Sequence, residues 1–436
     1  MSTTYVLCSR STAGSIDRNT KTKPFIKEET MKRSAFYVLG LMCLLATATN
    51  AYAQKKYGPG VTDTEIKIGQ NAPFSGPASA YSIVSKVQSA YVNMINSQGG
   101  INGRKINLIA RDDGYSTPKT IEVIRQLVED DQVLAIVSPF GTAPNVAMQK
   151  YLNTKQVPQL LVQSGASRFN DPKEFPWTTP FGSFNDTEGE IFANYILKSL
   201  PNAKIGVLYQ LDDIGKDYLK GLRAGLGDKA TTMIVKEVNN QITDPTVDSQ
   251  VLLLKDSGAD VVFLATTQKF GAQAIRKINE LGWKPKLLLT APVNSITTVL
   301  TPAGLDASTG AMTVVYYKQP DDPTWANDKG MRDYLSFMKD NLPNNVNDSL
   351  ALHAYGTIEV AMEILRRCGD DLTRENIIKQ ASNMKGFAVS VFIPGITLQT
   401  TPNNYSGVEQ MQFARFDGKT YIPFGEVLGR PQAASK

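Results

Sequence analysis

The sequence predicts an α/β protein built from two doubly wound lobes, each a parallel sheet with helices on both faces. Three observations carry this prediction. Short aliphatic runs alternate with helical patterns from about residue 65 to residue 300, which is typical of parallel sheets. The chain has 436 residues, more than the roughly 250–300 that one hydrophobic core usually spans. The alternation restarts after residue 181 with a second block about as long as the first, which favours two lobes over one barrel.

The first block is expected to contain four strands and three helices. Thr117 followed by Pro118 indicates a helix start, with threonine as the N-cap and proline at the first position. The preceding helix is expected to end at the Gly99-Gly100 pair. In chain order we expect strand 65–69, helix 82–97, strand 106–110, helix 118–130, strand 133–137, helix 143–153 and strand 159–162.

The second block continues the alternation, and the C-terminal part departs from it. We expect helix 188–199, strand 205–209, helix 216–225, strand 233–238, helix 246–255, strand 261–265, helix 271–281 and strand 287–290. Next come strand 311–318 and three helices at 330–340, 349–368 and 373–382. Strands 411–416 and 421–427 form a hairpin closed by Asp417-Gly418-Lys419.

The composition excludes several classes of enzyme. With 42% hydrophobic and 20% charged residues, the chain has an ordinary globular composition. It contains 3 Cys and 1 His, which excludes a disulfide framework and a histidine-rich metal site. The one histidine, His353, is expected on a long helix as a structural or surface residue. Because the nucleotide-binding, zinc-protease and hydrolase motifs are missing, we predict no catalytic residue, no metal and no cofactor.

The N-terminal region reads as an export signal. Met31-Lys32-Arg33 precedes an apolar run at 36–48, and Ala51-Tyr52-Ala53 has the small residues that a signal peptidase reads. The run is shorter than the roughly 20 apolar residues of a transmembrane helix. We therefore predict a signal peptide at 31–53, a non-native extension at 1–30, and a mature periplasmic monomer that starts at Gln54.

Removing the leader changes the charge balance. Residues 1–53 hold 7 of the 46 basic residues and 3 of the 41 acidic ones, which leaves 39 against 38. The basic character therefore belongs to the leader, and we expect no nucleic-acid partner.

Three loops at the carboxyl ends of the first-lobe strands predict a ligand-binding cleft. They span residues 73–82, 138–144 and 163–167, and each is rich in Gly or in small hydroxyl residues beside a helix start. Free backbone N–H groups, hydroxyls and a helix dipole suit an uncharged polar group or a carboxylate. Plain turn chemistry favours the same residue types, but three such loops at one sheet edge indicate a site.

Two acidic pairs have a simpler interpretation. Asp112-Asp113 and Asp212-Asp213 follow predicted strands, and neighbouring strand residues point to opposite faces, so neither pair forms a natural acid/base dyad. We interpret them as residues that cap helices or hold loops. Phe140, Tyr209 and Phe270 either pack in the core or contact a ligand, and both alternatives stay open.

Five segments carry a resemblance to a known family. They read TEIKIGQNAPFSGPASAYS, INSQGGINGRKINLIARDDGYSTPKTIEVIRQLVEDDQVLAIVS, VPQLLVQSGAS, KIGVLYQLDDIGKDYLKGLRAGL and GADVVFLATTQKFGAQAIRKINELGW. Over residues 64–428 the chain resembles the leucine/isoleucine/valine-binding family of periplasmic solute-binding proteins. The resemblance implies a type I periplasmic-binding fold, a three-segment hinge, and delivery of a solute to the permease of an ABC importer.

The resemblance also implies lobe boundaries and site positions. Hinge crossings near Phe181, Val315 and Tyr405 would divide the chain into lobe 1, 54–181 plus 316–405, and lobe 2, 182–315 plus 406–428. The residues that match the family's ligand positions are Tyr81, Phe140, Gly141, Thr142, Ser164, Gly165 and Ala166 in lobe 1, and Ile214, Thr266, Thr267 and Ala291 in lobe 2.

One departure from the family pattern bears on the ligand. The acid that pairs with a ligand ammonium in the family falls around Ala291, where this chain has no acid. Unless Asp212 or Asp213 replaces it, we expect a carboxylate that lacks the ammonium, held by Tyr81 and Phe140 through an aromatic or branched body. Two other functions remain open: a ligand-presenting sensor of the same fold, and an extracellular hydrolase that uses carboxylates.

Overall fold

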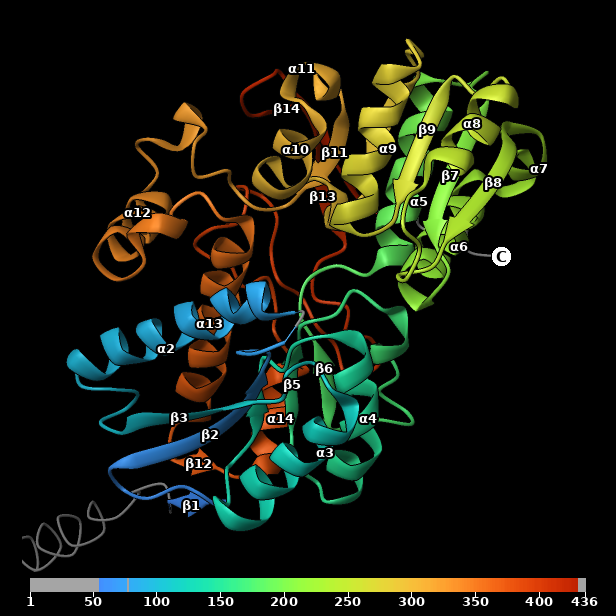
Figure 1. The fold of residues 1–436 in the computed structure, drawn as a ribbon. Coiled ribbons are helices and arrows are strands. Elements are labelled where there is room, and N and C mark those ends of the chain that lie inside the picture. Colours follow the sequence, from blue (N-terminus) through green and yellow to red (C-terminus); the bar gives the residue numbers. More distant parts are fainter. Residues whose placement is uncertain (1–54, 77, 430–436) are drawn as a thin grey trace, which may run out of the picture. The chain divides into compact units, whose positions relative to one another are not determined.

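Two sheets organise residues 55–76 and 78–429, which are the residues that this computed structural model describes (Figure 1). A five-stranded sheet precedes a seven-stranded one along the chain, and helices alternate with most strands of both, apart from a C-terminal hairpin. This arrangement confirms the predicted α/β class with two parallel-sheet lobes. The predicted signal peptide at 31–53, the extension at 1–30 and the start at Gln54 lie outside the described residues.

The first sheet is entirely parallel and has the order β3-β2-β4-β5-β6. Its strands are β2 (Glu65–Ala72), β3 (Lys105–Asp112), β4 (Ile136–Val137), β5 (Gln159–Val162) and β6 (Thr178–Pro180). β5 has its predicted bounds, whereas β4 is shorter than predicted and β6 was not predicted. Every strand of such a sheet runs in one direction, so all their carboxyl ends meet at one edge.

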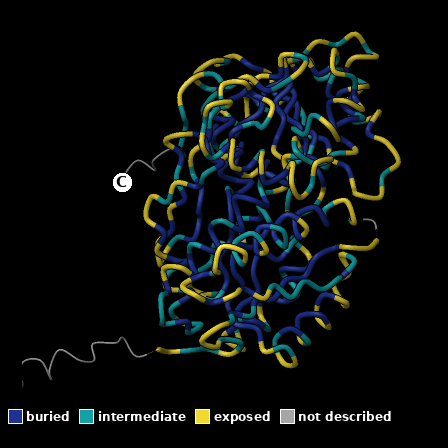
Figure 2. Tube along the Cα trace, turned by 90° about the vertical axis from the view of Figure 1, so that its left-hand side faces the viewer, coloured by how far each residue is buried: buried dark blue, intermediate teal, exposed yellow. Residues whose placement is uncertain are grey.

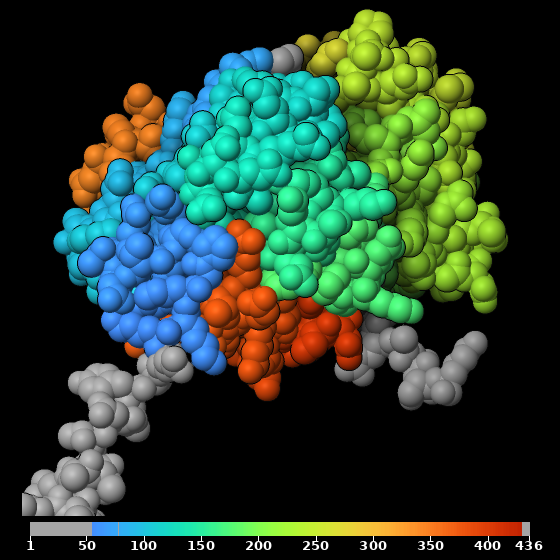
Figure 3. All heavy atoms as spheres, turned by 90° about the horizontal axis from the view of Figure 1, so that it is seen from below, coloured from blue at the N-terminus to red at the C-terminus, as the bar shows by residue number. Residues whose placement is uncertain are grey.

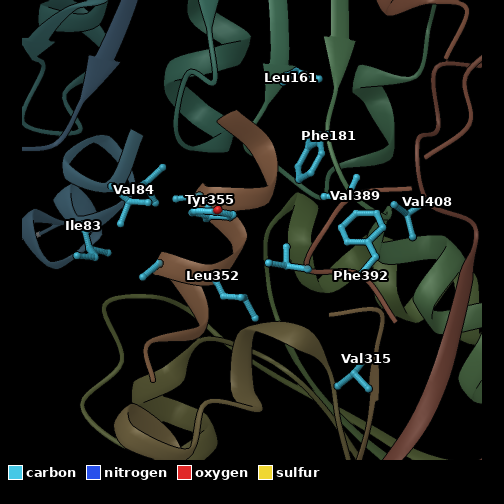
Figure 4. Packing of buried hydrophobic residues seen from close by; sticks show 14 of the residues in the cluster. Ile83, Val84, Leu161, Phe181, Val315, Leu352, Tyr355, Val389, Phe392 and Val408 are labelled. Atoms are coloured by element: carbon cyan, nitrogen blue, oxygen red, sulfur yellow. The ribbon is translucent and has the colours of Figure 1, made fainter. Parts of the chain in front are cut away.

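Helices cover both faces of the first sheet. α2 (Ser82–Ser97) and α13 (Ser349–Cys368) bury their apolar sides against Ile66 and Ile68 of β2. Figure 4 shows Ile83 and Val84 of α2 beside Leu352 and Tyr355 of α13. The opposite face packs against α3 (Thr117–Arg125) and α4 (Thr142–Thr154) through a separate cluster, which contains Val123, Ile124, Leu127, Ile136, Met148 and Leu152.

Helix ends follow local chemistry. α2 ends before Gly99, whose φ of 105° is accessible mainly to glycine, as predicted from the glycine pair. The Asp348 side chain caps α13 by accepting the N–H of Leu350 at 2.9 Å. At α3 the prediction was wrong by one residue, because Ser116 is the N-cap and Pro118 occupies the second helical position. The last turn, Gln126–Asp130, is a π-helix rather than a continuation of α3.

The second sheet has the order β14-β13-β11-β10-β9-β7-β8. Its strands are β7 (Ile205–Gln210), β8 (Ile234–Asn240), β9 (Val261–Ala265), β10 (Lys286–Leu289), β11 (Met312–Val315), β13 (Gln410–Phe416) and β14 (Tyr421–Gly429). β13 and β14 pair antiparallel, which confirms the predicted C-terminal hairpin, and β13 joins β11 antiparallel. α5 (Asn185–Ser199) and α6 (Asp213–Leu226) cover one face, and α8 (Asp248–Asp256) and α9 (Gln268–Glu280) cover the other.

Shorter elements complete the fold. β1 (Lys56–Tyr57) pairs with β12 (Asp371–Leu372), and Figure 3 shows the N-terminal segment in blue beside the orange residues near 370. α12 (Lys329–Asn341) and α14 (Arg374–Ala381) belong to the C-terminal part. The remaining helical turns are α7 (Ala230–Met233), α10 (Thr301–Ala303), α11 (Leu305–Ser308), 3-10 turns at Ser79–Tyr81, Ser167–Phe169, Gly227–Lys229, Ala291–Val293, Pro323–Trp325 and Pro343–Asn345, and a π turn at Ile296–Leu300.

The chain passes between the two sheets three times: after β6, after β11 and before β13. These passages contact one another, since Val408 donates its N–H to the carbonyl of Gly182 at 3.2 Å. Phe181 and Phe392 lie between them, with ring centroids 6.4 Å apart (Figure 4). Figure 2 shows that buried residues run through the interior and exposed residues collect in the outer turns. The exact lobe boundaries stay a prediction.

His353 lies on α13, as expected, at these passages. Its Nδ1 is 3.0 Å from the Tyr317 hydroxyl, and its Nε2 bonds the side-chain oxygen of Gln163. Burial lowers the pKa of His353 to about 4. The structure thus confirms the structural alternative for this residue and excludes the surface one.

Candidate functional site

A pair of hydroxyls joins the second and third loops at the carboxyl edge of the first sheet. The Thr142 Oγ1 lies 2.8 Å from the Ser164 Oγ, and both residues are partly buried. Ser164 Oγ also accepts the backbone N–H of Ala166 at 3.2 Å. Thr142 is the first residue of α4, where backbone N–H groups lack helical partners and the helix dipole favours negative charge. The structure therefore places two hydroxyls at a helix N-terminus.

Two of the predicted aromatic residues stand beside these hydroxyls. The rings of Tyr81 and Phe140 have centroids 4.8 Å apart at an interplanar angle of 31°. Phe140 also bridges to Gln163 in parallel register, which ties the second loop to the third. Burial raises the pKa of the Tyr81 phenol, so this hydroxyl is a neutral donor at neutral pH. The loops thus present an apolar surface next to a polar one.

A third aromatic residue, Tyr115, belongs to this group, and it was not predicted as a site residue from the sequence. Its ring centroid lies 6.3 Å from that of Phe140, and 38% of the residue is exposed. Tyr115 follows Asp112-Asp113 and Gly114 at the end of β3, the strand that neighbours β2. Its position just after a predicted strand could have indicated it, because all strands of a parallel sheet end at the same edge.

The ring of Tyr115 explains why position 141 is occupied by glycine. Its φ is 93°, and a Cβ placed on it would lie 2.3 Å from Cε2 of Tyr115. A serine at this position, as in the family pattern, would collide with the tyrosine ring. The ring of Tyr115 thus leaves no room for a side chain at position 141, and the role of the Thr142 hydroxyl in its place stays a prediction.

The acidic pair Asp112-Asp113 holds the turn that carries Tyr115. Asp113 accepts the N–H of Tyr115 at 2.9 Å, and its other oxygen accepts from Asn71 at 2.7 Å and from Thr120 at 2.8 Å. Asp112 accepts the N–H of Gly114 at 2.9 Å. These bonds confirm the interpretation of the pair as loop-holding residues.

The predicted ligand positions of the second lobe differ in how much of their surface is exposed. Thr266 is fully buried and donates to Asn240 Oδ1 at 2.8 Å, so it offers no surface to a solute in this structure. Ile214 and Thr267 are partly buried, and Ala291 is exposed. Phe270 is 1% exposed, which identifies it as a core residue and excludes the ligand-contact alternative.

The acids that could meet a ligand ammonium are already engaged. Asp212 caps α6 by accepting the N–H groups of Ile214 at 3.0 Å and Gly215 at 3.2 Å. Asp213 lies 3.6 Å from Arg168, and its side chain is 58% exposed. Both residues therefore have partners of their own, which weakens the case that either replaces the missing acid.

A buried acid stands behind Ala291, and sequence reasoning missed it. Glu188 Oε1 accepts the backbone N–H of Ala291 at 2.8 Å, and Oε2 accepts from the Tyr218 hydroxyl at 2.9 Å. Glu188 belongs to the first turn of α5, about a hundred residues earlier in the chain, so no local motif links it to Ala291. Burial raises the pKa of Glu188 to about 8, which leaves it mostly neutral at pH 7.

The third loop also contacts the helices that follow the first crossing. Asp217 on α6 accepts the N–H of Ser167 at 2.9 Å and the hydroxyl of Ser167 at 3.2 Å. The backbone of Gly165 accepts the N–H of Asn185, the first residue of α5, at 2.8 Å. The loop that carries Ser164 is therefore fixed to α5 and α6.

Two features are not found in the described part of the chain. No group of three or more His, Cys, Asp and Glu within residues 55–76 and 78–429 could hold a metal ion. None of the helices described there combines the length and the apolar character that crossing a bilayer demands.

Comparisons with known proteins agree with this architecture. The family model described as "Periplasmic binding protein" matches residues 65–420. A Leu/Ile/Val-binding protein homolog 7 from Brucella suis is 27% identical over 244 residues, which cover 54% of this chain and 60% of that relative. This chain thus matches less than two thirds of the length of that relative.

Solved structures of low sequence identity share the fold. A branched chain amino acid ABC transporter protein from Thermus thermophilus, with bound valine, has a TM-score of 0.74 at 16% identity, covering 85% of this chain and 98% of that one. A solute binding protein of an ABC transporter from Rhodopseudomonas palustris, in complex with 3,4-dihydroxy benzoic acid, has a TM-score of 0.69 at 18% identity, covering 84% and 98%. At these identities the likeness extends to the fold alone.

Proposed function

The chain belongs to the periplasmic binding protein family, and we propose that it captures a small carboxylate-bearing solute for the permease of an ABC importer. The observation that carries this proposal is the hydroxyl pair of Thr142 and Ser164 at the N-terminus of α4. One hydroxyl of the pair donates to the other, so the remaining hydroxyl proton and the backbone N–H groups at the start of α4 can bind one carboxylate. Export to the periplasm through the predicted signal peptide is part of the same proposal.

The proposed solute lacks an ammonium group. Burying an unpaired ammonium costs several kcal/mol, so a site for an α-amino acid needs an acidic or carbonyl partner. The 287–295 stretch contains no acid, Asp212 caps a helix, and Asp213 faces Arg168. Glu188 lies near Ala291, but both of its oxygens accept hydrogen bonds and its raised pKa keeps it mostly neutral. The negative charge of a bare carboxylate would meet hydroxyl and backbone N–H donors at the N-terminus of α4, whereas an ammonium would meet no free acid among these residues.

The body of the solute is proposed to be aromatic or branched. Phe140 bridges to Gln163, the residue before Ser164, and its ring contacts that of Tyr81, so ring surface lies in the same loops as the hydroxyl pair. One structural neighbour was crystallised with an aromatic carboxylate, 3,4-dihydroxy benzoic acid, and another with valine, so the fold accommodates both kinds of body. The absence of an acidic partner in this chain bears on the ammonium alone, so both kinds of body belong to the proposal.

Lobe closure would bury the solute. We propose lobes at 54–181 plus 316–405 and 182–315 plus 406–428, which rotate about the three crossings and enclose the site. The bonds from Ser167 to Asp217 support this, because they join the third loop of lobe 1 to α6 of lobe 2. The closed form would be the one that the permease recognises.

Matched ligand pairs test the proposal. We would titrate residues 54–436 by calorimetry with leucine and 4-methylpentanoate, and with phenylalanine and 3-phenylpropanoate, which differ within each pair only in the ammonium. The proposal expects each deaminated compound to bind at least about tenfold more tightly than its amino acid, because an unpaired ammonium is costly to desolvate. Tighter binding of both amino acids would contradict it, and loss of that binding in Asp213→Asn would identify Asp213 as the ammonium partner.

A further inference from the structure

The rings at the edge of the first sheet form a row. Tyr81 and Phe140 lie 4.8 Å apart between centroids, and Phe140 and Tyr115 lie 6.3 Å apart at an angle of 57°. Both distances fall in the range in which aromatic rings interact favourably. Tyr115 ends the row, and its exposed fraction of 38% shows that part of its surface is open to another group.

The ring of Tyr115 covers the start of helix α4. Its Cε2 would lie 2.3 Å and its hydroxyl oxygen 3.0 Å from a Cβ on Gly141, so the ring rests on a position that only glycine leaves free. The hydroxyl of Tyr115 also lies close to the backbone N–H of Thr142, the residue that contributes to the hydroxyl pair. The aromatic row and the polar end of the site therefore meet at this one tyrosine.

The chain holds Tyr115 in a conformation that tyrosine disfavours. Its φ is 59°, in the left-handed region that costs a bulky residue on the order of 1–3 kcal/mol. Asp113, which is fully buried, holds the N–H of Tyr115, and Ser75 braces the same turn by donating its N–H to Asp112 at 3.1 Å. A glycine or asparagine would fit this turn with less strain, so the side chain has a role that offsets its backbone cost.

We propose that Tyr115 is a specificity-determining residue, whose ring makes the site select planar aromatic carboxylates over branched aliphatic ones. The inference rests on the proposed function and deepens it. Because the rings are tilted by 31° and 57°, a flat ligand body can stack on one of them and meet the ring of Tyr115 edge to face, while its carboxylate reaches Thr142 and Ser164. A branched body touches the same row with less of its surface and gains less from Tyr115.

The selectivity ratio is the measurement that isolates this role. We would determine the Kd of 3-phenylpropanoate and of 4-methylpentanoate for the unmodified chain and for Tyr115→Gly. The variant is expected to lower the preference for the aromatic ligand about 3- to 10-fold, in line with the usual strength of one aromatic contact. Its Tm is expected to stay within about 2 °C of the unmodified chain, because relief of the left-handed strain offsets the lost packing of a part-exposed ring.

Two further variants make the result specific. Tyr115→Phe keeps the ring and removes only the hydroxyl, so it should keep the preference within about twofold of the unmodified chain. Tyr151→Ala is the control, since Tyr151 is a part-buried tyrosine near the end of α4, the helix that begins at Thr142, and its hydroxyl donates to Glu129 at 2.8 Å. It should leave the ratio unchanged.

The possible failures are distinguishable. An unchanged ratio in Tyr115→Gly, or an equal loss of both ligands, would overturn the role of Tyr115 while leaving carboxylate binding in place. A large drop in Tm together with an equal loss would identify the ring as structural. Binding of neither carboxylate by the unmodified, folded chain would overturn the proposed function and this inference together.

Discussion

Replacing Glu188 by glutamine should remove a pH dependence of stability that the structure builds in. The carboxyl of Glu188 is buried against Ala291 and Tyr218, and burial raises its pKa from the ordinary 4.5 to about 8. In the unfolded chain the same group ionises near its ordinary pKa. Between pH 4.5 and 8 the folded chain therefore keeps a proton that the unfolded chain has lost, so the free energy of unfolding falls as the pH rises.

The size of this effect follows from the two pKa values. The pKa differs between the unfolded and folded chains by the interval from about 4.5 to about 8, and each pH unit in that interval changes the free energy of unfolding by about 1.4 kcal/mol. The free energy of unfolding therefore falls by roughly 5 kcal/mol up to pH 8 and does not fall further above it. Glutamine preserves the contacts, because its carbonyl can accept the N–H of Ala291 and its amide can donate to Tyr218. The Glu188→Gln variant should therefore gain stability relative to the unmodified chain as the pH rises.

Urea denaturation at pH 5, 6, 7, 8 and 9 would measure this difference. The gap between the variant and the unmodified chain should widen up to pH 8 and then stay constant. Glu174→Gln is the control, because Glu174 is exposed and its replacement also removes one carboxyl group, and the gap should not widen. Parallel curves for Glu188→Gln would refute the reasoning. Glu188 would then be an ionised acid behind Ala291, and the argument against a ligand ammonium would lose its basis.

Two further predictions concern binding. Thr142→Ala and Ser164→Ala should each weaken binding of 3-phenylpropanoate by about 1–3 kcal/mol, because each removes a hydroxyl from a part-buried carboxylate site; calorimetry would measure this, and unchanged affinity in both folded variants would reject the site. Asp217→Asn should weaken ligand binding less, by about 0.5–1.5 kcal/mol, because it changes only the bond between Ser167 and α6 that favours closure. Small-angle scattering with saturating ligand should then find a larger open fraction, and identical profiles for variant and unmodified chain would exclude that role.

Regular elements could be predicted wherever local sequence and tertiary packing agree. Helices Ser82–Ser97 and Ser349–Cys368 and strands Gln159–Val162 and Val261–Ala265 have their predicted bounds, since each is a periodic or continuous apolar segment with clear ends. β6, only three residues long, carries no comparable pattern and forms because β5 offers it a partner. The local sequence thus predicts which long helices and strands form and in what order, whereas a short edge strand depends on the strand beside it.

The candidate site also has a part that the sequence predicts and a part that depends on tertiary contacts. The meeting of the three loops, with Tyr81 against Phe140 and Thr142 against Ser164, could be predicted, because loops that follow parallel strands must meet at one edge. The ring on Gly141 could not, since the left-handed turn of Tyr115 follows from side-chain bonds to Asp113 and Asp112.

What the sequence by itself determined was the class of fold, the edge of the first sheet at which the three loops meet, and the absence of an acid from the segment around Ala291. Only the tertiary structure decided which acid stands near Ala291, because Glu188 meets it across about a hundred residues of chain. It also decided the charge of that acid, since the pKa of Glu188 depends on burial that no neighbour in sequence provides. Periodicity and turn chemistry act over a few residues, whereas desolvation and contact depend on which distant segments the fold packs together.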